Sequence, residues 1–514
     1  MSLRVYNTLS KTKELFDPVK PGKVGMYLCG PTVYKSPHIG HMVGPVIFDT
    51  VKRYLVYKGY EVTWVVNITD IDDKLIDAAA RKGESVEAVA QKYTAEYMNV
   101  LASMGIDTID RFPKATEHLN DIIALCKTLI DRGHAYAGEG NVYFDVSRDP
   151  DYGKLSNRRV EEQESGTRAT EASGKRNPAD FALWKASKPG EPAFDSPWGP
   201  GRPGWHIECS AMSMKYLGES FDIHGGGMDL MFPHHENELA QSECATGKPF
   251  AKFWLHNGLT RVKTKTAGGE LKVDKLSGSD IAAGLQDGSA VDAQALIDAH
   301  GAELLRYLLL STHYRRPIEF TDDVLTSSKK GLGTFTRVFE RVERIVGKPI
   351  AEDEPDIDRV ASSLLETEAA GFVRAVLGLK MRYLEMMDDD FNTAGAIACL
   401  HDLAGQVNAF VEQHQVDANR QSDMVPAIVA ATQTLRKLGM VIGLFRKLPS
   451  RAATSDAQSK NAGLTEQLMQ LFIRLRAEAR ASKNFALADA VRKGLTDIGV
   501  TLEDRPDATV WRKD

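Results

Sequence analysis

The densest group of chemically active side chains lies in residues 221–244, FDIHGGGMDLMFPHHENELAQSEC. FDIH is typical of a short buried strand, and the three glycines after it let the backbone turn sharply and approach a ligand closely. Asp229 follows where the end of a strand would present it to a crevice. Pro233 suits the first position of a helix, which the helix formers of HHENELAQSE continue. The stretch therefore predicts a strand, a turn lined by a carboxylate, and a helix.

Side chains of this predicted helix could bind a metal. His234 and Glu238 are four positions apart and lie on one helix face, and His235 reaches Glu238 at a spacing of three, so both histidines stay candidates. Zinc binds imidazole, carboxylate and thiolate together in a closed tetrahedron, and here the thiolates would come from elsewhere in the chain. The competing interpretation is a solvated histidine–glutamate pair beside an ordinary glycine loop.

Two apolar runs near the N-terminus predict the parallel sheet that would position these groups. VGMYLC (residues 24–29) and EVTWVVNIT (residues 61–69) have strand length, and a helical pattern runs from about Gly40 to Tyr57 between them. Strand, helix and strand in this order build a right-handed parallel unit. The connecting loop carries HIGH, residues 38–41, where imidazoles beside the N-terminus of a helix suit phosphate binding. Gly40 leaves room for a ring or a ribose.

The composition is that of a globular protein with several domains. The 514 residues favour roughly three or four domains on the usual length prior. No segment has the layout of a signal peptide or the length of a membrane span, so we expect a cytoplasmic protein. Five scattered cysteines indicate free thiols or metal ligands. A formal charge of −6 gives no overall attraction to nucleic acid, so RNA binding would need a local basic surface.

The rest of the chain divides into segments of different predicted secondary structure and composition. A mostly helical pattern runs from Ser85, a predicted helix cap, to Gly133, and residues 147–204 are rich in loops, which indicates a functional insertion. Helices are predicted from Thr321 to Phe445, before a polar linker. A basic terminal unit follows, with Arg474, Arg476, Arg480, Lys483, Arg492 and Lys493.

Taken in order, the motifs resemble the cysteinyl-tRNA synthetases, a family of class I aminoacyl-tRNA synthetases. The resemblance rests on MYLCGPTVY, HIGH, NITDIDDKL, KRNPADFALWK, SPWGPGRPGWHIECSAM, HGGGMDLMFPHHENE, STHYR, DDDFNTAGA and KNFALADAVRKGLTDIGVTLED. It implies an α/β fold: a Rossmann-like parallel-sheet catalytic domain with an insertion, an α-helical anticodon-binding bundle and a small mixed α/β unit at the C-terminus.

The resemblance also implies boundaries along the chain. They are a first catalytic half (1–115), an insertion (116–204), a second catalytic half with the zinc site (205–258), a KMSKS-like loop and stem-contact region (259–320), the helical bundle (321–447), a linker (448–465) and an anticodon-recognition unit (466–514).

A zinc site made of Cys29, Cys209, His234 and Glu238 is implied by the resemblance, which alone selects His234 over His235. His206, His224 and His235 would then orient these ligands or line the cleft. For the other cysteines, Cys126, Cys244 and Cys399, we expect burial as small apolar side chains. A soft cation that binds the substrate as a thiolate would separate cysteine from serine, which shape alone does poorly. The zinc is thus expected to determine specificity, without an editing domain.

The implied reaction consumes ATP with Mg²⁺. Cysteine would form an adenylate, and the acyl group would pass to the 3′ end of the tRNA, so catalysis is mostly positioning and charge stabilisation. His38 and His41 would stabilise phosphate charge. The further residues that the resemblance places around substrate and ATP are Gly40, Thr69, Trp205, His224, Gly226 and Asp229.

The second signature of the family departs from its usual form. Where the family has KMSKS, this chain reads KVDKL, residues 272–276, and Lys275 keeps the place of the lysine that stabilises pyrophosphate. Asp274 beside it would repel phosphate. Lys263 and Lys265 are the alternative cations for this role.

The C-terminal third resembles the tRNA-reading part of the family. Arginines there would contact phosphates or bases and Trp511 could stack on an unpaired base, whereas the competing interpretation is a solvated charged face. The resemblance implies a monomer that binds L-cysteine, ATP and the cysteine tRNA and no membrane. Two rival functions are a ligase joining cysteine to an amino sugar, which residues 466–514 disfavour, and a synthetase-like RNA-binding protein, which HIGH and the zinc ligands disfavour.

Overall fold

The computed structural model describes residues 2–158, 174–265, 271–275, 292–419, 424–447, 455–482, 484–497, 500–504 and 509–513. Of these, residues 261–265, 271–275, 455–467, 501, 503–504, 510 and 512–513 are described by their backbone alone. The chain forms two compact units, Met1–Arg446 and Lys447–Asp514. None of the helices in these described ranges is both long and apolar enough to cross a bilayer.

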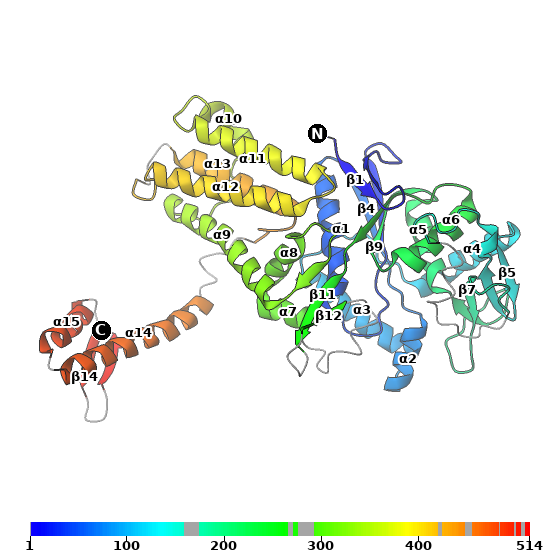
Figure 1. Ribbon diagram of the computed structural model, residues 1–514, viewed down its shortest axis with the longest axis horizontal. Helices are drawn as coiled ribbons and strands as arrows, with labels where there is room; N and C mark the ends of the chain where they lie inside the picture. Colours follow the sequence, from blue (N-terminus) through cyan, green and yellow to red (C-terminus); the bar gives the residue numbers. More distant parts are fainter. Residues whose placement is uncertain are drawn as a thin grey trace. The chain divides into compact units, whose positions relative to one another are not determined.

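A four-stranded parallel sheet forms the centre of the first unit (Figure 1). Its order is β10 (Ala251–Asn257), β9 (Phe221–Gly227), β3 (Lys23–Leu28) and β4 (Glu61–Val66). All three pairings are parallel. Strands β3 and β4 come from the first half of the catalytic sequence, and β9 and β10 come from the second half. Because β3 and β9 are adjacent and parallel, the residues that follow them meet at one edge of the sheet. The expected Rossmann-like sheet is confirmed.

Helix α1 (Ile39–Tyr57) connects β3 to β4 and begins at the HIGH motif. Its side chain Phe48 packs so closely on β9 that a Cβ added at Gly225 would lie 1.9 Å from the ring. Glycine is therefore required at this point of β9 for α1 to cover the sheet. Two further helices carry candidate ligands: α5 (Trp205–Leu217) precedes β9, and α6 (Glu236–Thr246) follows it.

The insertion between the two halves of the sheet folds on its own antiparallel sheet. Helix α4 (Leu119–Asp131) precedes β5 (Ala135–Gly138), β6 (Asn141–Phe144), β7 (Phe181–Ala186) and β8 (Gly201–Pro203), which pair in that order. Phe144, Trp184 and Cys126 are buried in its core. Residues 147–204, predicted to be loop-rich, thus contain two strands.

The remaining elements of the first unit pack around this core. They are β1 (Arg4–Asn7), β2 (Thr12–Leu15), α2 (Asp73–Lys82), α3 (Val86–Ser103), β11 (Thr260–Lys265), β12 (Leu271–Lys275), α7 (Ala293–His300), α8 (Ala302–Leu310) and β13 (Ile318–Phe320). The side chain of Ser85 caps α3 by accepting a hydrogen bond from the Ala88 amide, as predicted.

A helical bundle completes the first unit. Its members are α9 (Asp322–Val346), α10 (Ile357–Leu364), α11 (Ala370–Asp388), α12 (Thr393–Gln413) and α13 (Val425–Val441). The predicted helical region from Thr321 is confirmed, because Thr321 caps α9 through the Val324 amide.

The second unit is small and mixed, as predicted. It contains α14 (Ser455–Ala481), α15 (Phe485–Asp497), β14 (Val500–Asp504) and β15 (Thr509–Lys513), and the two strands pair antiparallel. Met469, Leu495, Val500 and Leu502 form its buried cluster. The polar stretch 448–465, interpreted as a linker, is helical from Ser455 onward, and residues 448–454 lie outside the described part of the chain.

Candidate active site

Four side chains from distant segments meet at the sheet edge where β3 and β9 end. Cys29 directly follows β3, Cys209 lies in α5, His234 lies in the turn Met231–His235, and Glu238 lies in α6. One ligand atom of each lies within 4.8 Å of the others. The Sγ atoms of Cys29 and Cys209 are 3.8 Å apart, and Glu238 Oε1 is 3.3 Å from Cys29 Sγ. His234 Nε2 lies 3.0 Å from the same carboxylate oxygen.

This donor set fits a tetrahedral zinc ion. Zinc–sulfur bonds of about 2.3 Å at tetrahedral angles place two sulfurs about 3.8 Å apart, which is the spacing of Cys29 and Cys209. Burial raises the pKa of both thiols and lowers that of His234. A bound cation would hold the sulfurs as thiolates and leave the imidazole neutral.

A second set of donors overlaps the first. Cys29 and Glu238 also lie within 4.8 Å of ligand atoms of His224 and His235, which replace Cys209 and His234 in this set. Like helical spacing, the geometry therefore does not decide between His234 and His235 as the histidine ligand. The set with two sulfurs is richer in the soft ligands that zinc favours.

The other histidines predicted around the metal contact the candidate ligands or each other. His206 Nδ1 lies 2.9 Å from His234 Nδ1, and His224 Nε2 lies 2.9 Å from Glu238 Oε2. His235 instead contacts His256, with 2.8 Å between their ring nitrogens. Burial lowers the pKa of His206 to about 3. These contacts fix the orientation of the His234 ring and of the Glu238 carboxylate.

The HIGH histidines are adjacent at the start of α1. The rings of His38 and His41 stack with centroids 3.6 Å apart, and the His38 amide donates to His41 Nδ1 at 3.1 Å. Burial lowers the pKa of His38 to about 4 and also lowers that of His41. Gly40 lies between them in the first turn of the helix. Both imidazoles are therefore neutral hydrogen-bonding groups beside the positive end of the helix dipole.

Of the two predicted amino-acid pocket residues, Trp205 contacts a candidate metal ligand and Thr69 contacts the residue before one. Trp205 stacks on His234 with ring centroids 4.2 Å apart. Thr69 follows β4, and its Oγ1 lies 3.2 Å from Glu208 Oε2 and accepts a hydrogen bond from the Asn67 side chain. Sequence reasoning missed Glu208, which is buried, and whose carboxyl pKa is raised by burial. The signal available was a carboxylate next to Cys209 in a helix of small and apolar residues.

The three glycines were predicted to form a turn after a short strand, but they are the last residues of β9 and pair with β10. Their lack of side chains brings the backbone against its neighbours. A Cβ added at Gly226 would lie 2.6 Å from the His235 ring, and one at Gly227 would lie 2.4 Å from Asp229 Oδ1. Asp229 is exposed just beyond the strand, and its position at a crevice stays a prediction. His224, which precedes the glycines, is fully buried against Trp254, with stacked rings 4.4 Å apart.

The KMSKS-like segment is described by its backbone. Strands β11 and β12 pair antiparallel, with Lys263 opposite Val273 and Arg261 opposite Lys275. The side chains of Lys263, Lys265 and Lys275, and residues 276–291, lie outside what the structure describes, so the choice of pyrophosphate-binding lysine stays a prediction.

Basic residues of the second unit are divided between core and surface. Arg476 is buried, whereas Arg474, Arg480 and Lys493 are exposed. Arg492 donates to the Leu502 carbonyl at 3.2 Å. Trp511 is half-buried and packs against the apolar cluster of this unit. Lys483 lies outside the described residues.

The three cysteines outside the metal cluster are free thiols. Cys126 and Cys399 are buried, as predicted. Cys244 is half-buried beside the apolar core of the insertion, where burial raises its pKa to about 12.

Comparison with known proteins gives a consistent result. Residues 15–330 match the model for the catalytic domain of tRNA synthetases class I (C), and residues 382–446 match the DALR domain. Cysteine–tRNA ligases of Thermodesulfovibrio yellowstonii and Syntrophotalea carbinolica are each 44% identical, covering 99% and 100% of both chains. The fold is similar to that of Mycobacterium tuberculosis methionyl-tRNA synthetase in complex with methionyl-adenylate, with a TM-score of 0.54, 16% identity and coverage of 82% and 89%. The chain therefore belongs to the cysteine–tRNA ligase family of class I aminoacyl-tRNA synthetases.

Proposed function

We propose that this protein activates L-cysteine with ATP and Mg²⁺ and transfers the cysteinyl group to the 3′ end of the cysteine tRNA. The observation that carries the proposal is the donor set of half-buried Cys29 and buried Cys209, His234 and Glu238 at the edge of the catalytic sheet. The names of relatives that match along the whole chain support the same substrate.

The donor set would hold a zinc ion, and the zinc would supply a Lewis acid that binds the substrate sulfur as a thiolate. A serine hydroxyl is a far poorer ligand at neutral pH, so specificity for cysteine follows from ligand chemistry. Trp205, stacked on His234, closes the wall of the pocket beside the metal. Thr69 is held by Asn67 and Glu208 on another wall.

The HIGH segment would bind the phosphates of ATP. His38 and His41 are neutral donors at the N-terminus of α1, where the helix dipole favours negative charge. The glycines at the end of β9 would let the adenosine or the amino acid lie against the backbone, with Asp229 at the rim. Lys275 in β12 would neutralise the departing pyrophosphate, with Lys263 and Lys265 as alternatives.

The helical bundle and the second unit would bind the tRNA, in line with the DALR match over residues 382–446. Exposed Arg474, Arg480 and Lys493 supply local positive charge in a chain whose formal charge is −6. We also propose a cytoplasmic monomer, consistent with five free cysteines. The seven-segment division of the chain stays part of this proposal.

Cysteine-dependent exchange of pyrophosphate into ATP, measured alongside charging of tRNA, tests the function. We expect both activities, with cysteine strongly preferred over serine. Exchange without charging of tRNA, but with ligation to an amino sugar, would identify the amino-sugar ligase instead. Binding of tRNA without any exchange would identify an RNA-binding protein.

A further inference from the structure

The DDDFNTAGA motif lies where the helical bundle meets the catalytic sheet, and the proposed chemistry gives it no role. Helix α11 ends at Asp388 and α12 begins at Thr393. Between them, Asp390 and Phe391 have φ angles of 64° and 51°, in the left-handed region that bulky residues seldom adopt. Such a backbone persists only where surrounding contacts determine it.

The first two carboxylates of this turn bind different parts of the catalytic unit. Asp388 is buried and accepts a hydrogen bond from the Tyr54 hydroxyl at 2.6 Å, and its Oδ1 lies 3.0 Å from Lys58 Nζ. Tyr54 belongs to the last turn of α1, and Lys58 is its C-cap. Asp389 Oδ1 lies 2.5 Å from Lys13 Nζ of β2, in a pair in which Asp389 is exposed and Lys13 is half-buried.

The third carboxylate is fully buried and binds two more segments. Asp390 accepts hydrogen bonds at 2.8 Å from the Tyr6 amide of β1, the Tyr314 hydroxyl and Arg315 Nε. Its own amide donates to the Arg4 carbonyl at 2.8 Å. Tyr314 and Arg315 belong to the STHYR motif, so two motifs that sequence analysis separated form one contact. A buried carboxylate with three donors is compensated for its lost hydration.

Helix α1 is the element that the bundle and the nucleotide site share. Its N-terminus carries His38 and His41, and its C-terminal end is held by Asp388. In its middle, buried Asp49 pairs with buried Arg306 of α8 at 2.7 Å.

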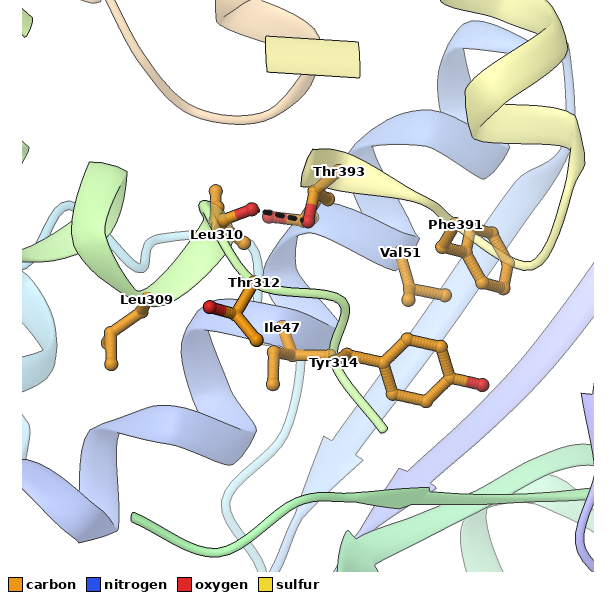
Figure 2. Close-up of a pocket in the computed structure, with 9 residues that line it drawn as sticks. Ile47, Val51, Leu309, Leu310, Thr312, Tyr314, Phe391 and Thr393 are labelled. Atoms are coloured by element: carbon orange, nitrogen blue, oxygen red, sulfur yellow. Dashed lines mark hydrogen bonds between the residues drawn. The ribbon is translucent and has the colours of Figure 1, made fainter. Parts of the chain in front are cut away.

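Figure 2 shows the side chains packed between these two attachments. Ile47 and Val51 of α1 face Leu310, Phe391 and Thr393 around a cavity of only about 10 Å³, and Thr393 Oγ1 donates to the Leu310 carbonyl at 2.7 Å. That volume is near the lower limit for one water molecule, so the joint is almost completely filled. A close-packed joint of this kind transmits displacement instead of absorbing it.

We propose that Asp388 and Asp390 are positioning residues for the transfer of the cysteinyl group to tRNA. Asp388 holds the bundle against α1, and Asp390 holds it against β1 and the STHYR segment. Together they fix the orientation of the bundle relative to the adenylate that forms at the start of α1. A tRNA anchored on the bundle then presents its 3′ end in register with the adenylate. In the proposed function, the groups that form the adenylate belong to the catalytic half of the chain, and none of them belongs to the bundle. The inference rests on the proposed function.

Asp388→Asn and Tyr54→Phe test it, because each removes part of the link between the turn and α1 with little change of shape. Asp389→Asn is the matched control, since a solvent-exposed carboxylate gains little from its pair with Lys13. We expect single-turnover transfer from preformed adenylate to slow by about tenfold or more in both test variants, because small misplacements of reacting groups have large effects. The rate of cysteine-dependent exchange should stay within about twofold of the wild-type rate. The dissociation constant for tRNA should stay within about threefold of the wild-type value, which is less than about 1.4 kcal/mol of binding free energy. Asp389→Asn should transfer at the wild-type rate.

Three results would overturn the inference. One is unchanged transfer in both test variants, and another is an equal loss in Asp389→Asn. The third is a parallel fall of exchange and transfer that tracks the melting temperature, which would indicate a purely structural role. Wild-type protein without cysteine-dependent exchange would instead refute the proposed function, so the two failures are distinguishable.

Discussion

Replacing Cys209 by serine tests the proposed metal site at the donor that α5 supplies. The Sγ atoms of Cys29 and Cys209 lie 3.8 Å apart, the spacing that two zinc–sulfur bonds require. Serine offers a neutral oxygen in place of a thiolate and needs a shorter bond to the metal. The cradle would keep three donors, and the fourth would be both harder and misplaced.

The expected loss follows from the size of the donor set. Structural zinc sites bind with apparent free energies of about 10–16 kcal/mol shared over four donors, so one donor contributes on the order of 3 kcal/mol. Zinc affinity should therefore fall roughly a hundredfold in Cys209→Ser. The preference for cysteine over serine in the exchange reaction should fall by about tenfold or more, because it depends on the same ion.

Zinc affinity can be measured by competition with a chromophoric chelator, and substrate preference by pyrophosphate exchange with each amino acid. Cys126→Ser is the matched control, since Cys126 is equally buried but lies in the apolar core of the insertion. It should keep its zinc and its specificity and lose only some thermal stability. A Cys209→Ser protein with wild-type zinc affinity and wild-type preference for cysteine would refute the reasoning.

Three further predictions concern stability. Gly443→Ala should lower the free energy of unfolding, measured by urea titration, by more than about 1 kcal/mol. The φ angle of Gly443 is 77°, and the added Cβ would lie 2.2 Å from Arg306 Nη1. A smaller loss would contradict the described packing. Arg306→Met should cost about 3 kcal/mol, since it leaves buried Asp49 with Arg53 as its remaining cationic partner, and a neutral effect in the same titration would contradict this. Burial lowers the pKa of His38 to about 4, so the unfolded chain takes up the proton first as the pH falls. The His38 contribution is complete above about pH 6.5 and falls by up to about 3 kcal/mol towards pH 4, and His38→Gln should flatten this part of the stability curve.

The sheet and its first crossover helix could be predicted because their signals are local. VGMYLC predicts a strand at residues 24–29 and β3 is Lys23–Leu28; the helix predicted from Gly40 to Tyr57 is α1, Ile39–Tyr57. The helix start predicted at Pro233 agrees with the backbone angles. Phe232 is extended, whereas His235 and Glu236 are helical and lead from Pro233 into α6, which is regular from Glu236 onward. The residue before the proline is extended, as the clash of a proline ring with the preceding residue favours.

In the candidate site too, contacts between neighbours in the sequence could be predicted and contacts between distant segments could not. Helical spacing predicted that His234 and Glu238 share a face, and their side chains do meet. Spacing could not select Cys29 and Cys209, because contacts over such separations leave no local pattern, and only the family resemblance supplied them. Glu208 was missed because a glutamate in a helix is ordinarily solvated, and only the fold shows that this one is buried beside Thr69.

The long separation of the candidate ligands has a consequence for biosynthesis. Cys29 and Glu238 are 209 positions apart, and Cys209 comes late as well. On the ribosome, the first cysteine emerges long before its partners exist, so a nascent chain that ends before α6 has only part of the cradle. Capture of the metal is therefore a late event that follows synthesis of α6, and nascent chains released before that point would carry a sulfur exposed to other metals and to oxidants.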